Sequence, residues 1–370
     1  MNLTRHRPDF LLLVTILLLV SIGLLTIYSA SMIWAYLQGK PAHYFFIRQC
    51  IWVSVGLVAM IVTMNLPFWI WRKLLPLLLL ASIGTLCLVL LLPAVKDVHR
   101  WINLGPLSFQ PSELATLSII IYASHILAKK QDQLDTFKKT VVPPLVVAGL
   151  FALLVILEPD MDAAALIVVT ALAILFGSGV PLRHLEKVVL PSALAAVPLV
   201  LFSGYRRERV FSFLDPFSEA NLLTNGWQQA HSLYAIASGG WTGRGLGRSI
   251  EKFGYLPEPH TDFIFSIFHE EWGAIGGILL ILLFAVLVWR ALRIASLLPD
   301  RFGALMAIGI AAMIGIAAFV NIGMVIGVFP VMGIPLPFIT YGGTAMLMKM
   351  VAMGILLNLS RYTVEKSHQS

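Results

Sequence analysis

Long apolar runs recur along the whole chain and constrain its fold more than any other feature. A helix that crosses a bilayer needs about 20 predominantly apolar residues, and ten runs approach or exceed that length. They cover residues 10–31, 46–65, 74–93, 112–128, 143–157, 163–180, 188–203, 263–289, 304–328 and 341–359. The fourth to seventh runs are the shortest, which predicts tilted or partly buried helices there.

The composition agrees with a membrane protein. Apolar and aromatic residues make up 58% of the 370 residues, Asp, Glu, Lys and Arg make up 12%, and the mean hydropathy is +0.87. Soluble domains carry about 25% charged residues, so this chain cannot cover a soluble surface. We therefore predict an all-α polytopic membrane protein with about ten transmembrane helices, in which residues 1–370 form one integral membrane domain.

The basic residues predict the orientation. The net charge is +7, and most Lys and Arg of the short loops fall on the side of the N-terminus, which predicts that both termini are cytoplasmic. The basic residues form scattered clusters rather than a stripe, so no nucleic-acid partner is expected. Arg5 and Arg7 before an apolar run could also mark a secretory signal, but this run is too long and begins a series of spans.

The sequence lacks the patterns that are typical of several kinds of site. The two cysteines, Cys50 and Cys87, lie inside apolar runs, so neither a disulfide framework nor a CxxC metal site is expected. No GxxxxGK[ST] or HExxH motif occurs, which argues against ATP use and a dedicated zinc site.

The segment 204–262, between the seventh and eighth runs, is the one connection of domain-like length, and it is predicted to be extracytoplasmic. Long loops without secondary structure are often functional. Its glycine-dense part, 238–247, also contains Arg244. Such a loop could bind phosphate through backbone N–H groups and guanidinium forks, or it could be a surface loop whose arginines pair with acids. The residues alone favour neither interpretation.

Asp262 lies where this polar segment becomes the eighth apolar run, with Glu270 and Glu271 further along it. An ionisable residue at the mouth of a span is costly unless it is paired, solvated or used. Burial beside other carboxylates would raise its pKa toward the range useful for proton transfer. The alternative is an N-cap for the eighth helix, which the residues alone slightly favour.

A series of short motifs runs along the chain in a fixed order. They are Tyr28-Ser29-Ala30-Ser31, Arg48-Gln49, Arg100-Trp101-Ile102, FQPSE at 109–113, Pro159-Asp160, FLDP at 213–216, GGxxGxGLG at 239–247, LPEPHTDFIF at 256–265, Glu270-Glu271, Asn321-Ile322-Gly323, PLPF at 335–338 and Tyr341-Gly342-Gly343. Together they resemble the SEDS family (shape, elongation, division and sporulation), whose members include RodA, FtsW and SpoVE. The stretch 232–240 and the tail 357–362 are most similar to the SpoVE and FtsW branch.

The resemblance implies a peptidoglycan glycosyltransferase that polymerises lipid II, the undecaprenyl-diphosphate-linked disaccharide-pentapeptide, at the outer face of the bacterial cytoplasmic membrane. Asp262 matches the family's essential aspartate and would be the general base that takes the proton of the acceptor 4-hydroxyl. The donor linkage is α and the product linkage is β, which implies one inverting displacement without a covalent enzyme intermediate. Cell division, elongation and sporulation all remain open as the process it serves.

The resemblance also implies substrate-binding residues. Candidates for stabilising the departing diphosphate are Arg48, Arg100, Arg206, Arg209 and Lys252. The other candidate substrate-binding residues are Trp101, Gln110, Glu113, Asp160, Ser232, Glu258 and His260. No resident metal is assigned, although a divalent cation, Mg²⁺ or Mn²⁺, could bind near the extra carboxylates Glu158 and Asp162.

The chain departs from the family pattern at several positions. The family usually follows Pro-Ser-Glu closely with Lys, whereas this chain has Thr116, so Glu113 lacks its usual partner. Lys349, a charge inside the tenth run, could be the other partner. The remaining departures are Glu158, Asp162 and Ala163 where QPDxGT is usual, His231 in place of Gln, and His269 in place of Gly.

Partners follow from what the chain lacks. No SxxK, SxN and KTG constellation of a transpeptidase is present, so the resemblance implies a separate class B penicillin-binding protein, together with divisome, elongasome or sporulation proteins. Two alternatives to the polymerase stay open: a lipid II flippase, and a non-catalytic scaffold of a cell-wall synthesis complex.

Overall fold

Each of the ten apolar runs corresponds to a helix in the computed structural model, which describes residues 6–93, 99–104, 107–201, 204–224 and 226–364. These helices are α1 (Phe10–Leu37), α2 (Tyr44–Asn65), α3 (Ile70–Leu91), α4 (Pro111–Lys129), α6 (Val142–Leu157), α7 (Met161–Gly177), α8 (Leu182–Leu201), α12 (Ile264–Leu297), α13 (Arg301–Val325) and α14 (Gly343–Ser360). A short 3₁₀ turn (Gln131–Gln133) and α5 (Phe137–Thr140) connect α4 to α6.

Seven of the helices in the described part of the chain are long and apolar enough to cross a membrane: α1, α2, α3, α4, α12, α13 and α14. Helices α6 and α7 are apolar but shorter, as their short apolar runs predicted. The all-α polytopic membrane fold is therefore confirmed. The number of helices that actually span, and the side on which each loop lies, remain predictions.

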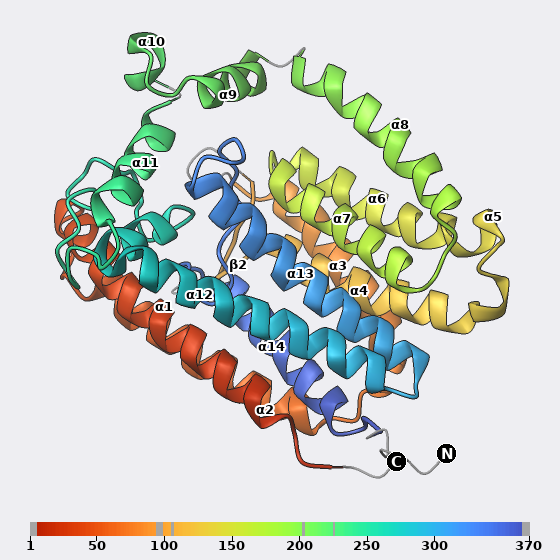
Figure 1. The fold of residues 1–370 in the computed structure, drawn as a ribbon. Coiled ribbons are helices and arrows are strands. Elements are labelled where there is room, and N and C mark those ends of the chain that lie inside the picture. Colours follow the sequence, from red (N-terminus) through yellow and green to blue (C-terminus); the bar gives the residue numbers. More distant parts are fainter. Residues whose placement is uncertain (1–5, 94–98, 105–106, 202–203, 225, 365–370) are drawn as a thin grey trace.

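The helices pack closely where small residues face a neighbouring helix. On α14, a Cβ added to Gly354 would lie 1.9 Å from Oγ1 of Thr63 and 2.5 Å from the carbonyl oxygen of Met60, both on α2. Membrane helices associate through such small residues because they let two backbones approach. Both chain ends lie at one end of the bundle (Figure 1).

A β-hairpin lies at the start of α4. Its strands β1 (Ile102–Leu104) and β2 (Leu107–Phe109) are antiparallel, with Ile102 opposite Phe109. The hydroxyl of Thr344, in the first turn of α14, donates to the carbonyl of Ser108 at 2.7 Å. This bond fixes the hairpin, and the residues on either side of it, against the bundle.

The segment 204–262 contains more secondary structure than the sequence suggested. It forms α9 (Gly204–Leu214), α10 (Glu219–Leu222) and α11 (Trp227–Gly239), followed by turns. Figure 1 shows α9 and α10 at the edge of the molecule, whereas α11 leads back to the start of α12. The interpretation as an unstructured loop was therefore wrong for this part of the chain, because local hydrogen bonds satisfy its backbone.

Candidate active site

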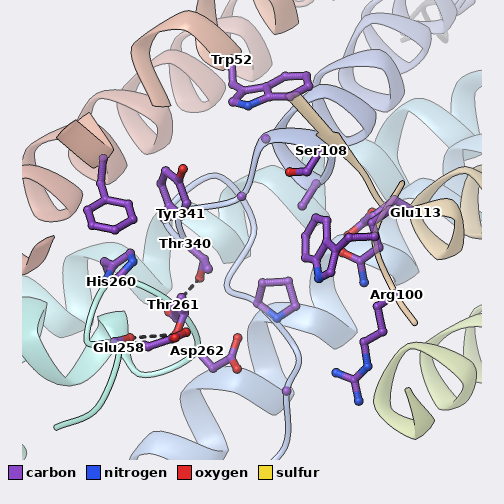
Figure 2. A pocket seen from close by; sticks show the side chains of 18 of the residues that line it. Trp52, Arg100, Ser108, Glu113, Glu258, His260, Thr261, Asp262, Thr340 and Tyr341 are labelled. Carbon is purple, nitrogen blue, oxygen red and sulfur yellow. Dashed lines mark hydrogen bonds between the residues drawn. The ribbon is translucent and has the colours of Figure 1, made fainter. Parts of the chain in front are cut away.

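A cavity of about 580 Å³ lies at the far end of α1 from the chain termini. Its walls come from the end of α1, the start of α2, the hairpin, the start of α4, residues 258–262 and residues 333–345. Nine of the predicted site residues line it: Arg48, Arg100, Trp101, Gln110, Glu113, Asp160, Glu258, His260 and Asp262. Figure 2 shows Asp262 and Arg100 among the side chains that line this pocket.

The backbone around Asp262 is held from two directions. The side-chain amide of Asn321, on α13, donates to the carbonyl of Asp262 at 2.7 Å and to that of Ile334 at 2.8 Å. The N–H of Tyr341 donates to the carbonyl of His260 at 3.0 Å. Asp262 is thus positioned by contacts to its main chain, which leave its carboxylate available to the cavity.

Asp262 is not a helix cap, so the N-cap interpretation was wrong. The residue that precedes α12 is Phe263, and no side chain makes a capping bond there. The neighbouring Thr261 hydroxyl does not cap the helix either, since it donates to the carbonyl of Glu258 at 2.8 Å, as Figure 2 shows. The aspartate therefore requires an explanation other than helix capping.

The surroundings of Asp262 favour its protonated form. Burial, and then the negative charges of Asp162, Glu258 and Asp160, raise the pKa of Asp262 to about 7, against the opposing effect of Arg100. The carboxylates of Asp162 and Asp262 both lie beside Gly333, because a Cβ added to this glycine would be within 4 Å of an oxygen of each. A carboxyl group with this pKa can accept a proton at neutral pH.

Three cations also line the cavity. Arg100 donates from Nε to the carbonyl of Glu158 at 3.3 Å and lies 3.8 Å from the Asp160 carboxylate. Arg48 donates to the Tyr44 hydroxyl at 2.7 Å, and the Lys40 ammonium lies 4.6 Å from the centre of the Tyr44 ring. A cavity that contains these cations and the Asp262 carboxyl group of raised pKa suits an anionic substrate that loses a proton.

The acidic side chains near Arg100 do not fit a metal site. Asp160 caps α7 through the N–H of Ala163, and Asp162 accepts the N–H of Gly333. Burial, followed by the charge of Asp160, raises the pKa of Glu158 to about 8, and neither of its carboxyl oxygens has a hydrogen-bond partner. Within the described ranges, no three His, Cys, Asp or Glu side chains could hold a metal ion. The suggested Mg²⁺ or Mn²⁺ site is therefore not supported.

The predicted partnership of Glu113 and Lys349 is confirmed. The Lys349 ammonium forms an ion pair and a hydrogen bond with Oε2 of Glu113, and the two side chains are 3% and 11% exposed. Thr116 instead donates its hydroxyl to the carbonyl of Ser112 at 2.8 Å within α4. Lys349 on α14 therefore neutralises Glu113, because α4 has Thr116 and no lysine beside this acid.

Other predicted substrate-binding residues lie away from the cavity. Lys252 is buried and donates at 2.9 Å to both Glu271 and the Ser29 hydroxyl. Ser232 is buried and bonds to Ser266 and to the carbonyl of Val325, each at 2.8 Å. Neither side chain lines the cavity, because both are engaged in hydrogen bonds between separate segments of the chain.

The two remaining arginines belong to α9. Arg209 donates to the carbonyl of Val331 at 3.3 Å and is not among the cavity-lining residues. The side chain of Arg206 lies outside the described residues. The cations that meet in the cavity thus come from the α1–α2 connection, α2 and the segment before the hairpin.

The glycine-dense loop is bound to α12, which is interrupted at Gly273 (φ +69°, ψ −174°). The N–H groups of Arg244 and Gly245 donate to the carbonyls of Glu270 and Glu271, and the N–H groups of Ala274 and Ile275 donate to Gly240 and Trp241. These four N–H groups are therefore engaged within the protein. The phosphate-loop interpretation was wrong here, because the loop satisfies the backbone groups that the break leaves unpaired.

The sequence interpretation missed several lining residues. Phe45 and Tyr341 contact the His260 ring, with ring centres 4.5 and 5.5 Å from it. Lys40 was missed as well, although its position in a short loop eight residues before Arg48 could have revealed it. The aromatic contacts had no local signal, because they join residues 215 and 81 positions apart.

The two unusual histidines make ordinary contacts. His231 bonds through Nδ1 to Glu251 at 2.7 Å, and its ring centre lies 4.1 Å from that of Trp227. The ring centre of His269 lies 6.2 Å from that of Phe265. His231 is thus a hydrogen-bonding residue of the 204–262 segment.

The chain is similar to known proteins in both sequence and structure. Residues 9–365 match the family model of FtsW, RodA and SpoVE, described as "Cell cycle protein". The chain is 41% identical to stage V sporulation protein E of Bacillus subtilis, over 98% of this chain and 100% of that protein. It is 39% identical to a probable peptidoglycan glycosyltransferase FtsW of Trichlorobacter lovleyi, over 95% of this chain and 93% of that protein.

Solved structures show the same fold. A chain from a study of how a peptidoglycan synthase complex coordinates polymerization and crosslinking superposes with a TM-score of 0.80, at 27% identity over 96% of this chain and 98% of that one. The crystal structure of the rod shape determining protein RodA of Thermus thermophilus superposes with a TM-score of 0.70, at 26% identity over 96% of this chain and 98% of that chain.

Proposed function

The chain belongs to the FtsW, RodA and SpoVE family, and from this we propose that it polymerises lipid II at the outer face of the bacterial cytoplasmic membrane. As a family member it is a multi-pass membrane protein and a peptidoglycan glycosyltransferase. The substrate, the side of the membrane and the residue roles below are our proposal.

In the proposed reaction, Asp262 acts as the general base. It takes the proton of the acceptor 4-hydroxyl while that oxygen forms a bond to the anomeric carbon of the donor. The bond from this carbon to the diphosphate oxygen breaks, and the diphosphate leaves with the electron pair. A single displacement of this kind inverts the anomeric configuration and needs no covalent enzyme intermediate.

The observation that supports the proposal is that the candidate base and three cations line the same cavity. Asp262, whose pKa is about 7, shares the cavity with Lys40, Arg48 and Arg100. A diphosphate leaving group gains negative charge in the transition state, so fixed cations stabilise it more than the ground state. No protonating acid is needed for such a leaving group.

The proposed partner is a class B penicillin-binding protein. One structural relative comes from a complex that coordinates polymerization and crosslinking. Crosslinking needs a transpeptidase, and this chain lacks the combination of SxxK, SxN and KTG motifs that is typical of one. Divisome, elongasome or sporulation proteins would then determine where the pair acts.

The proposal is tested by giving purified protein, with and without such a partner, lipid II and resolving the glycan products on a gel. Asp262→Asn keeps the shape of the side chain and removes the base, so we expect the rate to fall by roughly 10²–10⁴-fold. Asp132→Asn, at an exposed position, is the matched control and should polymerise normally. Glycan strands formed at the wild-type rate by Asp262→Asn would disprove the proposed base.

The same assay addresses the two alternatives. Wild-type protein that forms no polymer even with its partner would favour a flippase or a scaffold over the polymerase. Transport of lipid II across vesicles by protein that makes no polymer would then identify the flippase.

A further inference from the structure

A second cavity, of about 520 Å³, lies at the end of the bundle that carries both chain termini. It is formed by the segment before α1, the first residues of α1, the last turns of α12 and the end of α14. Phe10 lines this cavity and Trp34 lines the candidate active site. At 1.5 Å per residue along α1, roughly 36 Å separate them, so the two cavities are distinct.

The lining of the second cavity is strongly basic. It contains Arg7, Arg290 and Arg293, against one acid, Asp9. That acid is already engaged: Oδ1 accepts the N–H of Leu12 at 2.9 Å as the N-cap of α1, and Oδ2 accepts from Nε of Arg290 at 2.9 Å. Asp9 therefore neutralises Arg290 only.

Two positive charges remain without a carboxylate. Among the described residues, neither Arg7 nor Arg293 forms an ion pair, and the Arg293 guanidinium lies 5.5 Å from the centre of the Trp289 ring. Two guanidinium groups that share one cavity can each offer paired N–H donors to phosphate oxygens. The cavity thus suits an anion that carries a phosphate group.

The rim of the cavity is apolar and exposed. Phe10 is 76% exposed and Leu11 is 45% exposed, and both line the cavity at the start of α1. Trp289, one residue before Arg290, is 50% exposed. Tryptophan beside arginine is typical of the boundary between headgroups and acyl chains. A ligand here would place its charge among the arginines and its apolar part against α1.

We propose that this cavity binds the phosphate headgroup of an anionic phospholipid from the adjacent leaflet. Anionic lipids are attracted to basic clusters next to spans, and this cluster differs from scattered topology-determining charges because it encloses a cavity. The proposal is independent of the glycosyltransferase reaction and of its active site.

Occupation of the cavity should also stabilise the protein. The segment before α1 already crosses the end of α14, since the N–H of His6 donates to the carbonyl of Arg361 at 2.8 Å and that of Asp9 to the Ser360 hydroxyl at 3.0 Å. Asp9 already connects this segment to Arg290 of α12, and a phosphate held between Arg7 and Arg293 would add a second connection. Bound lipid should therefore raise the Tm.

The test uses purified full-length protein in a neutral detergent. Phosphatidylglycerol, phosphatidylcholine with the same acyl chains, and inorganic phosphate are each titrated, and bound lipid and Tm are measured by native mass spectrometry and thermal unfolding. Wild-type protein should retain phosphatidylglycerol and gain Tm, with little response to phosphatidylcholine. The double variant Arg7→Ala, Arg293→Ala should bind it about tenfold or more weakly.

Lys138→Ala removes an exposed cation from α5, and this variant should bind lipid like wild type. Within the described part of the chain, neither arginine of the double variant leaves an ion-pair partner behind. Elution of the variant as a single monodisperse peak checks its folding. Arg293→Lys, which keeps the charge but removes the fork, should bind with intermediate affinity. Equal binding of both lipids, undiminished binding by the double variant, or an equal gain of Tm from inorganic phosphate would each overturn the proposal.

Discussion

Asp262 is surrounded by other carboxylates, and its protonation should therefore control activity. Burial and the charges of Asp162, Glu258 and Asp160 raise its pKa to about 7. A general base must be deprotonated, so kcat/KM should fall tenfold per pH unit below about pH 7 and level off above it. The direction follows from the role: an acid catalyst with this pKa would lose activity as the pH rises.

Asp162→Asn should shift the fall of kcat/KM at acidic pH, the acidic limb of the pH profile, to lower pH. The substitution removes the largest charge effect that raises the pKa of Asp262, while the amide oxygen can still accept the N–H of Gly333. The measurement is the pH dependence of polymerisation for wild type and variant. Asp132→Asn, an exposed position, should leave the limb in place. A limb that stays unmoved in Asp162→Asn would contradict the assignment to Asp262.

Glu113 and Lys349 form a buried pair whose loss should be strongly non-additive. Removing one partner leaves the other charge buried and unpaired, which costs roughly 3–5 kcal/mol. Glu113→Gln and Lys349→Met should each lower the free energy of unfolding by about that amount. The double variant should recover part of it, with a coupling of about 1–3 kcal/mol.

A double-mutant cycle at Arg72 and Asp300 is the matched control. The side chains of this pair are 38% and 29% exposed. Its coupling should stay within about 1 kcal/mol because water screens both charges. Denaturation in detergent measures both cycles. Additive effects at Glu113 and Lys349 would show that the two residues do not act as a pair.

At the scale of elements, the break in α12 and the glycine-dense loop form one unit. The loop not only caps the broken helix but also leads to residues 249–252, which surround the acid pair. Ser249 bonds to Glu270, the N–H of Ile250 donates to Glu270 at 2.9 Å, and Lys252 neutralises Glu271. Two buried carboxylates are thereby satisfied about two helical turns inside α12.

Gly273→Ala should disrupt this unit. The residue has φ +69°, and a Cβ would lie 2.3 Å from the N of Gly243 and 2.5 Å from the carbonyl oxygen of Trp241. The backbone strain alone costs about 1–3 kcal/mol, and the clash adds to it. Thermal unfolding of the detergent-solubilised protein should show a lower Tm and polymerisation should fall.

Gly84→Ala is the control for Gly273→Ala. Gly84 lies within α3, and nothing lies within 4 Å of an added Cβ. Alanine favours a helix over glycine by about 1 kcal/mol, so the Tm should be unchanged or slightly higher. Equal Tm values for the two variants would argue that the break does not need a glycine.

For the whole molecule, the candidate active site and the chain termini lie at opposite ends of the bundle, which makes the orientation testable. In a background of Cys50→Ser and Cys87→Ser, Lys138→Cys should react with a membrane-impermeant maleimide only in inverted vesicles. Trp241→Cys, at a side chain that is 74% exposed, should react in intact cells. The opposite pattern would place the active site inside the cell.

The sequence predicted the helices well because their signal is local. An apolar run of sufficient length indicates a helix whatever its neighbours are, and the ten runs all correspond to helices. Asp262 was also identifiable, through its position at the start of a run and through the family motif around it. Its place in the cavity wall then required the structure, because Asn321 and Tyr341 position it from distant parts of the chain.

The charged residues show most clearly what the sequence determines and what only the tertiary structure determines. By itself, the sequence determined the membrane fold, the family and the candidate base, since these depend on composition and on short motifs. The tertiary structure alone decided that Lys40 faces the cavity while Lys252 pairs with Glu271, and that Lys349 pairs with Glu113. A cation's role depends on which acid lies within a few ångströms of it, and helix packing, including the break at Gly273, determines that proximity.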